Sequence, residues 1–162
     1  MKHWNQKHLA WHETLELHEL VAFQSTQLVG FKKKLPTIKN SSLRTLYRET
    51  IQSIEQNLHE LLQFYPSAWS MDRHSSFPDM TAVESGSLLG FSKAAVRNYA
   101  AAITETATPQ LRETFKRHLL KAIDLHGRVF YFMFYNGYYP AYDLEQLLAN
   151  DVKMAKNALA FR

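Results

Sequence analysis

A chain of 162 residues fits one ordinary domain, and its five glycines and five prolines are too few for the many turns of a β-sandwich or barrel. Cysteine is absent, which excludes disulfides, thiolate metal sites and thiol nucleophiles. The formal charge of +4 is spread along the chain rather than concentrated in one segment, so no nucleic-acid partner is expected.

The amino-terminal residues 1–11 are mostly polar or charged, which predicts no signal peptide. No apolar run approaches the roughly 18 residues that a membrane-spanning helix needs. We therefore expect synthesis in the cytoplasm and no membrane contact.

Apolar residues at helical spacing predict a first pair of helices, over residues 8–35 and 42–65. Ser41 or Ser42 can cap the second of these helices. The basic run Lys32, Lys33 and Lys34 falls at the end of the first helix, where positive charge favours the negative end of the helix dipole. Because about six residues connect the two helices, they form an antiparallel hairpin.

Residues 66–80 are the one long irregular stretch, bracketed by Pro66 and Pro78. About 15 residues at roughly 3.3 Å each could cross the height of a helical bundle, as in ferritin-like folds. Trp69 and Phe77 predict that this segment packs against the bundle.

A second helical hairpin is predicted over residues 81–107 and 109–136. The segment Thr81 to Glu84 has the form of a capping box, which starts the first helix there or one turn later. Thr108-Pro109 caps the second helix, and Gly137 can terminate it.

An amphipathic carboxy-terminal helix is predicted over residues 143–160. The fold expected for residues 1–162 is a single all-α domain: a four-helix bundle of ferritin-like shape, made of two antiparallel hairpins plus the carboxy-terminal helix. Two helical hairpins in series also indicate internal duplication.

A helical bundle with eight histidines has to be tested as a di-metal carboxylate protein. Such sites use Glu-x-x-His pairs that project inward from two helices, and this spacing occurs nowhere in the sequence. We therefore expect no metal or other cofactor. One alternative is a mononuclear site from Glu19, Glu55 and His59, which antiparallel pairing would bring to one level; the opposing interpretation is that they lie on solvated faces in i, i+4 ion pairs. His126 falls in an apolar stripe, as a hydrogen-bonded core histidine would.

Other chemistry has no support. No Gly-x-Ser-x-Gly elbow is present, and the segment Gly86 to Gly90 lacks the lysine of a P-loop and the third glycine of a dinucleotide fingerprint. The chain is therefore expected not to be an enzyme.

The most unusual composition is the aromatic segment of residues 130–142. A helix buries only about a third to a half of its circumference, so these rings cannot all face one core. Three interpretations remain open: packing against the carboxy-terminal helix, a dimer or lattice contact, and a pocket for an aromatic ligand. The residues that we expect at a partner contact are all tyrosines, whose large apolar bodies carry polar tips: Tyr131, Tyr135, Tyr138, Tyr139 and Tyr142.

Residues 86–142 contain a characteristic set of segments: Ser-Leu-Leu-Gly-Phe-Ser-Lys at 87–93, Asn-Tyr-Ala-Ala-Ala-Ile-Thr-Glu at 98–105, Pro-Gln-Leu-Arg at 109–112, His126, and Gly-Tyr-Tyr-Pro-Ala-Tyr at 137–142. In this combination the sequence resembles the Coat F domain of spore-forming bacilli. Tyr138 departs from the tryptophan expected there.

The resemblance implies a ferritin-like fold and a place in or near the spore coat, and it carries no catalytic residues. We therefore expect a structural or assembly protein of the spore coat that contacts a second copy of itself or other coat proteins. The alternative is a metal-binding ferritin-like enzyme with the non-standard site of Glu19, Glu55 and His59.

Overall fold

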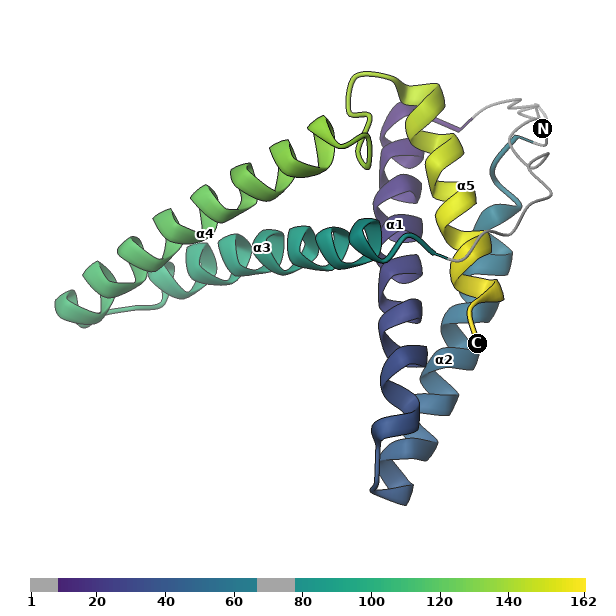
Figure 1. Cartoon of the computed structure of the whole chain (residues 1–162). Helices are drawn as coiled ribbons and strands as arrows, with labels where there is room; N and C mark the ends of the chain where they lie inside the picture. Colours follow the sequence, from purple (N-terminus) through teal and green to yellow (C-terminus); the bar gives the residue numbers. More distant parts are fainter. Residues whose placement is uncertain (1–8, 67–77) are drawn as a thin grey trace, which may run out of the picture. The chain divides into compact units, whose positions relative to one another are not determined.

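The computed structural model describes residues 9–66 and 78–162, and all regular structure in them is helical. Five α-helices and one short 3-10 helix follow one another in the described residues: α1 (Trp11–Lys34), η1 (Leu35–Thr37), α2 (Ser41–Leu62), α3 (Met80–Thr104), α4 (Pro109–Tyr135) and α5 (Leu144–Ala160) (Figure 1). The all-α prediction is confirmed. Within the same residues, no helix combines the length and hydropathy that crossing a membrane requires.

The chain divides into two compact units. Unit 1 comprises Met1–Phe77 and Glu145–Arg162, so α5 returns to the two amino-terminal helices, while unit 2 is Pro78–Leu144. Most of the irregular stretch predicted at 66–80, with its crossover and with Trp69 and Phe77, lies outside the described residues.

Two predicted helix starts are wrong by one or two residues, because a stronger capping residue lies just ahead. Asn40 caps α2 in place of Ser41 or Ser42, and its side chain accepts a hydrogen bond of 2.9 Å from the N–H of Leu43. Asp79 caps α3 by accepting from the N–H of Thr81, so Thr81 does not begin the helix as a capping box. The predicted end of α4 at Gly137 is confirmed, since this residue takes the positive φ of 74° that glycine allows.

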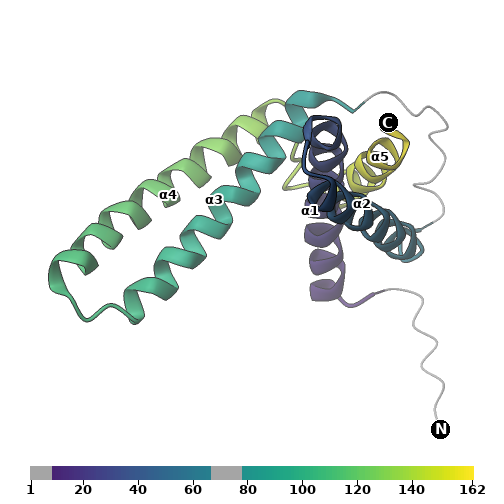
Figure 2. The same cartoon turned by 90° about the horizontal axis from the view of Figure 1, so that it is seen from below.

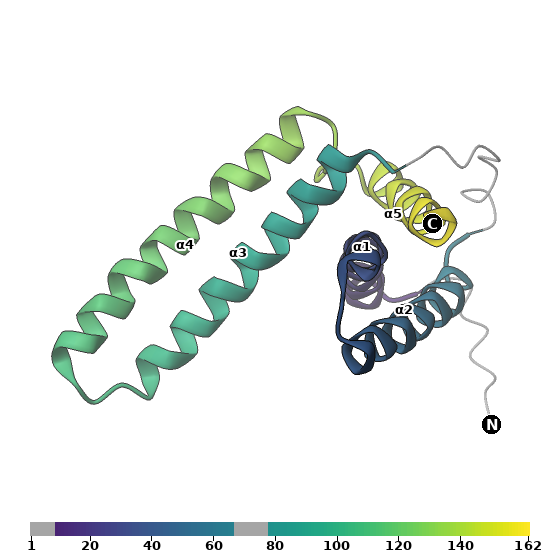
Figure 3. The same ribbon diagram turned by 60° about the horizontal axis from the view of Figure 1, so that its bottom comes forward.

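Unit 1 is a three-helix arrangement in which α5 lies beside the α1–α2 hairpin (Figure 3). Residues on α5 recur at helical spacing in its buried stripe, which faces this hairpin: Leu147, Leu148, Asp151, Val152, Ala155 and Ala158. The other side of the core comes mainly from α1 and α2, where Val21, Leu28 and Leu58 are completely buried.

Unit 2 is the antiparallel hairpin of α3 and α4 (Figure 2). Its buried core is small and consists of Leu89 on α3 with Val129 and Met133 on α4. Four partly buried side chains pack against this core: Leu125, Phe130, Tyr138 and Tyr139. Buried Ser85 and Ser92 lie on the same side of α3 as Leu89, one turn before and after it.

The two hairpins repeat the same contacts at positions 68 residues apart. Phe31 packs edge-on against Tyr47 with ring centroids 5.5 Å apart, and Tyr99 packs against Phe115 at 6.0 Å, so 31 and 47 correspond to 99 and 115.

The two connecting turns correspond in the same way. The guanidinium of Arg44 donates to the carbonyl of Ile38, and that of Arg112 donates to the carbonyl of Thr106, again 68 positions later. These shared contacts support the internal duplication that the sequence indicated.

Candidate functional site

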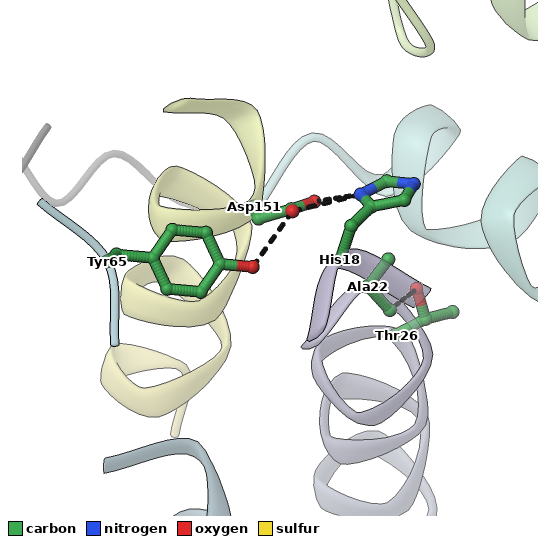
Figure 4. Close-up of polar contacts among 5 residues, drawn as sticks. All are labelled: His18, Ala22, Thr26, Tyr65 and Asp151. Atoms are coloured by element: carbon green, nitrogen blue, oxygen red, sulfur yellow. Dashed lines mark hydrogen bonds and ion pairs between the residues drawn. The ribbon is translucent and has the colours of Figure 1, made fainter. Parts of the chain in front are cut away.

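A buried polar cluster joins the three helical segments of unit 1 (Figure 4). Nδ1 of His18 on α1 lies 2.9 Å from both carboxylate oxygens of Asp151 on α5. The hydroxyl of Tyr65, just beyond α2, donates to Oδ2 of Asp151 at 2.9 Å. The three residues are 4%, 2% and 8% exposed, for His18, Asp151 and Tyr65 respectively. The cluster therefore ties α5 to both other segments of its unit.

Burial is the dominant electrostatic influence on this cluster. It raises the pKa of the Asp151 carboxyl above its ordinary value, although the hydrogen bonds from His18 and Tyr65 oppose the rise. Burial, and then the nearby Asp151 carboxylate, raise the pKa of the Tyr65 hydroxyl far above its usual range. Tyr65 therefore remains a hydrogen-bond donor at any ordinary pH.

A second polar link holds the carboxy-terminal end of α5. The ammonium group of Lys32 donates to the carbonyls of Ala158 (3.0 Å) and Leu159 (3.1 Å) and lies 2.7 Å from a carboxylate oxygen of Glu55 on α2. These carbonyls are in the last turn of α5, where a positive charge meets the negative end of the helix dipole. Lys32 of the basic run therefore interacts with the carboxy-terminal end of α5 as well as lying at the end of its own helix. The sequence did not show the contact with α5.

The structure does not bring Glu19, Glu55 and His59 together as a set of metal ligands. Glu55 forms an ion pair with Lys32. Glu19 lies near enough to Asp151 to raise the pKa of the Asp151 carboxyl. In residues 9–66 and 78–162 no group of three His, Asp or Glu side chains is placed to hold a metal ion. His126, the expected core histidine, is only partly buried; among the histidines that the structure describes, His18 is the buried one.

The aromatic segment of unit 2 divides into an outer and an inner set. Tyr131, Tyr135 and Tyr142 are 56%, 78% and 87% exposed, and we call these three the outer tyrosines. The rings of Tyr131 and Tyr135 are stacked with centroids 6.0 Å apart, and Tyr142 meets Phe134 edge-on at 5.5 Å. The neighbouring rings thus hold the outer tyrosines in place while leaving most of their surface accessible.

Tyr138 and Tyr139 form the inner set, because they pack against the core of unit 2. Their backbone N–H groups both donate to the carbonyl of Met133, at 2.8 and 3.3 Å, which fixes the chain as it leaves α4. The ring of Tyr139 meets Phe130 edge-on at 5.6 Å. Of the five tyrosines expected at a partner contact, these two therefore pack within unit 2 and stabilise its fold.

The sequence contains a signal for the polar cluster, in the form of polar residues within two apolar stripes. Asp151 stands in the apolar stripe of α5 between Leu148 and Ala155, where a charged residue has to find a buried partner. His18 similarly lies between Leu17 and Val21 on α1. A search for charged residues within apolar stripes would have found both residues, although not their pairing.

The comparison with protein families points to unit 2. The Coat F domain family matches residues 83–142, which lie within the bounds of that unit. The spore coat protein F-like protein YraD of Bacillus subtilis (strain 168) is 35% identical over 72 residues, which cover 44% of this chain and 73% of that protein. No solved structure matches the chain significantly.

Proposed function

The chain belongs to the Coat F family of spore coat proteins, and from this membership we propose that it is a structural and assembly protein that acts through protein–protein contacts and not through catalysis. The expected location is the spore coat, after synthesis in the cytoplasm. The partners are a second copy of the chain or other coat proteins.

The observation that carries this proposal is the exposure of the outer tyrosines. Tyr131, Tyr135 and Tyr142 lie on the segment that the family shares, and each presents more than half of its surface. Tyrosine is enriched at protein interfaces because its ring buries a large apolar area while its hydroxyl can bond to a polar rim. The polar clusters of unit 1, in contrast, are buried or engaged in holding α5.

We also propose that the two units belong to one domain in which the hairpins form a ferritin-like four-helix bundle. The repeated contacts of the two hairpins support this, since duplicated hairpins are suited to pairing around a common core. Small-angle scattering from the purified chain, compared with the profile of such a bundle, tests this arrangement.

The functional test is the recovery of the tagged chain in the coat fraction of spores from a sporulating bacillus. A variant with Tyr131→Ser, Tyr135→Ser and Tyr142→Ser should lose most of its coat recovery while its thermal unfolding stays unchanged. The matched control replaces three exposed aromatic residues of unit 1, Trp11, Phe23 and Phe64, by serine. Equal coat recovery for the tyrosine variant and the native chain would contradict the proposal.

A further inference from the structure

One face of unit 2 corresponds to the face of unit 1 that binds α5. In unit 1 the side chains that bind α5 are His18, Lys32 and Tyr65, and Glu55 forms an ion pair with Lys32. The positions 68 residues later hold no such polar groups, and their residues are Gly86, Ala100, Ile123 and Met133. At three of these four positions the hairpin of unit 2 therefore has a small or apolar residue outside its buried core in place of a polar one, while Met133 lies within that core.

An apolar stripe runs along α4 on this face, and we call it the α4 stripe. Its positions are separated alternately by three and four residues, which is the spacing of a helix–helix seam: Leu120, Ile123, Gly127, Phe130 and Phe134. Leu120 is 61% and Ile123 47% exposed, so the hairpin itself does not cover them.

No close packing contact within the described residues 9–66 and 78–162 requires a glycine at position 127, the centre of the stripe. Glycine in the interior of a helix destabilises it relative to alanine, and an added Cβ at Gly127 would meet nothing within 4 Å. A missing side chain in the middle of an exposed apolar stripe is what allows a second helix to approach closely.

Charges beside the stripe indicate what that second helix is. Asp124 and Arg128 are both exposed, and neither side chain has an ion pair or hydrogen bond with any other described residue. If two copies of α4 pack antiparallel about Gly127, Asp124 of each copy comes to within about one helical turn of Arg128 of the other. The same pairing sets Leu120 opposite Phe134 and Ile123 opposite Tyr131.

We propose that the α4 stripe is a homodimer interface, in which α4 of a second copy packs antiparallel against it about a twofold axis at Gly127. This inference rests on the proposed assembly function and names its partner and register. The interface brings Tyr131, one of the outer tyrosines, into contact with the second copy. The remaining outer tyrosines flank it and stay available for further contacts.

Disulfide trapping in the full-length chain tests the register, because the native sequence has no cysteine. Gly127→Cys should form a disulfide-linked dimer under mild oxidation, and the added side chain has room. Leu120→Cys is the control, since its two copies would lie 14 helical positions apart, about 21 Å, which is too far for a disulfide. Trapping of Leu120→Cys as fast as Gly127→Cys, or no trapping of Gly127→Cys, would overturn the proposal.

Light scattering on variants in which the charges of Asp124 and Arg128 are reversed tests the proposed contact between these two residues of different copies. Asp124→Arg and Arg128→Asp should each raise the dimer dissociation constant at least tenfold, and the double variant should restore it; Ile123→Glu should give monomers. A dimer unaffected by all of these changes would refute this interface and leave the assembly function standing. A native chain that is monomeric at every concentration and absent from coats would refute both. Ile123→Glu that lowers the melting temperature without changing the mass would show that the same chain covers the stripe, which also overturns the proposal.

Discussion

Replacing Asp151 by alanine should strongly destabilise unit 1. The carboxylate is 2% exposed and is the acceptor for Tyr65 and the partner of His18. Its removal leaves two buried polar groups without this partner, at about 1–3 kcal/mol each. We therefore expect Asp151→Ala to lower the free energy of unfolding by about 2–6 kcal/mol.

Urea unfolding at pH 7, followed by circular dichroism, gives the measurement. Tyr65→Phe alone should cost about 1–2 kcal/mol, and in the Asp151→Ala background it should cost less, because the hydrogen bond from the Tyr65 hydroxyl to Asp151 has already been removed. Lys153→Ala, an exposed position on the same helix, is the control and should change stability by less than about 0.5 kcal/mol. If Tyr65→Phe costs the same in both backgrounds, or Asp151→Ala unfolds like the native chain, the cluster does not hold α5.

The remaining predictions concern the other polar links and the inner tyrosines. Lys32→Met should lower the free energy of unfolding by about 1–3 kcal/mol, because Glu55 and two α5 carbonyls lose their interaction with Lys32. Lys34→Met is the control and should leave the free energy of unfolding nearly unchanged. Urea unfolding of both variants gives the comparison. Tyr138→Ala with Tyr139→Ala should lower the melting temperature by several degrees through lost packing, in contrast to the outer tyrosines, and calorimetry distinguishes the two sets. Arg44→Met and Arg112→Met should each lower the free energy of unfolding by about 1 kcal/mol, because they remove the same contact from separate units. The two losses should add in the double variant; a loss that differs from their sum would contradict this. Because burial raises the pKa of the Asp151 carboxyl above its ordinary value of 3.8, its contribution to stability is complete below that pH and is lost as the pH rises through the folded-state pKa. The stability of the native chain relative to Asp151→Asn should therefore fall as the pH rises above 3.8; a rise would show that the hydrogen bonds from His18 and Tyr65 outweigh burial.

The helices could be predicted from the sequence because their signals are local. Apolar spacing located all five α-helices, and the Pro109 and Gly137 signals fixed both ends of α4. The starts of α2 and α3 were misplaced because two capping candidates lay within two residues of each other, and Asn40 and Asp79 accept the hydrogen bonds. Such competition between neighbouring caps is decided by backbone geometry that the sequence does not display.

The polar cluster could not be predicted as a cluster, because its members are far apart in the chain. His18 and Asp151 are separated by 133 residues, and Tyr65 and Asp151 by 86. Helical periodicity places a residue on a face of its own helix but does not say which helix that face meets. The same limit explains why Glu55 looked like a possible metal ligand, whereas its partner in the structure is Lys32.

The duplication of the hairpin explains why the two units can serve different purposes. Both hairpins keep the arginine that fastens the connecting turn and the aromatic pair that joins the two helices, so both form the same local structure. They differ at the four positions that bind a third helix, where unit 1 has polar groups and unit 2 has Gly86, Ala100, Ile123 and Met133. A polar face pairs only with a helix that carries matching groups at the right positions, as α5 does through Asp151, whereas an apolar face accepts any helix of complementary shape. At these positions unit 2 therefore lacks the polar groups that select α5 in unit 1, which agrees with the proposed binding of a second copy to the α4 stripe.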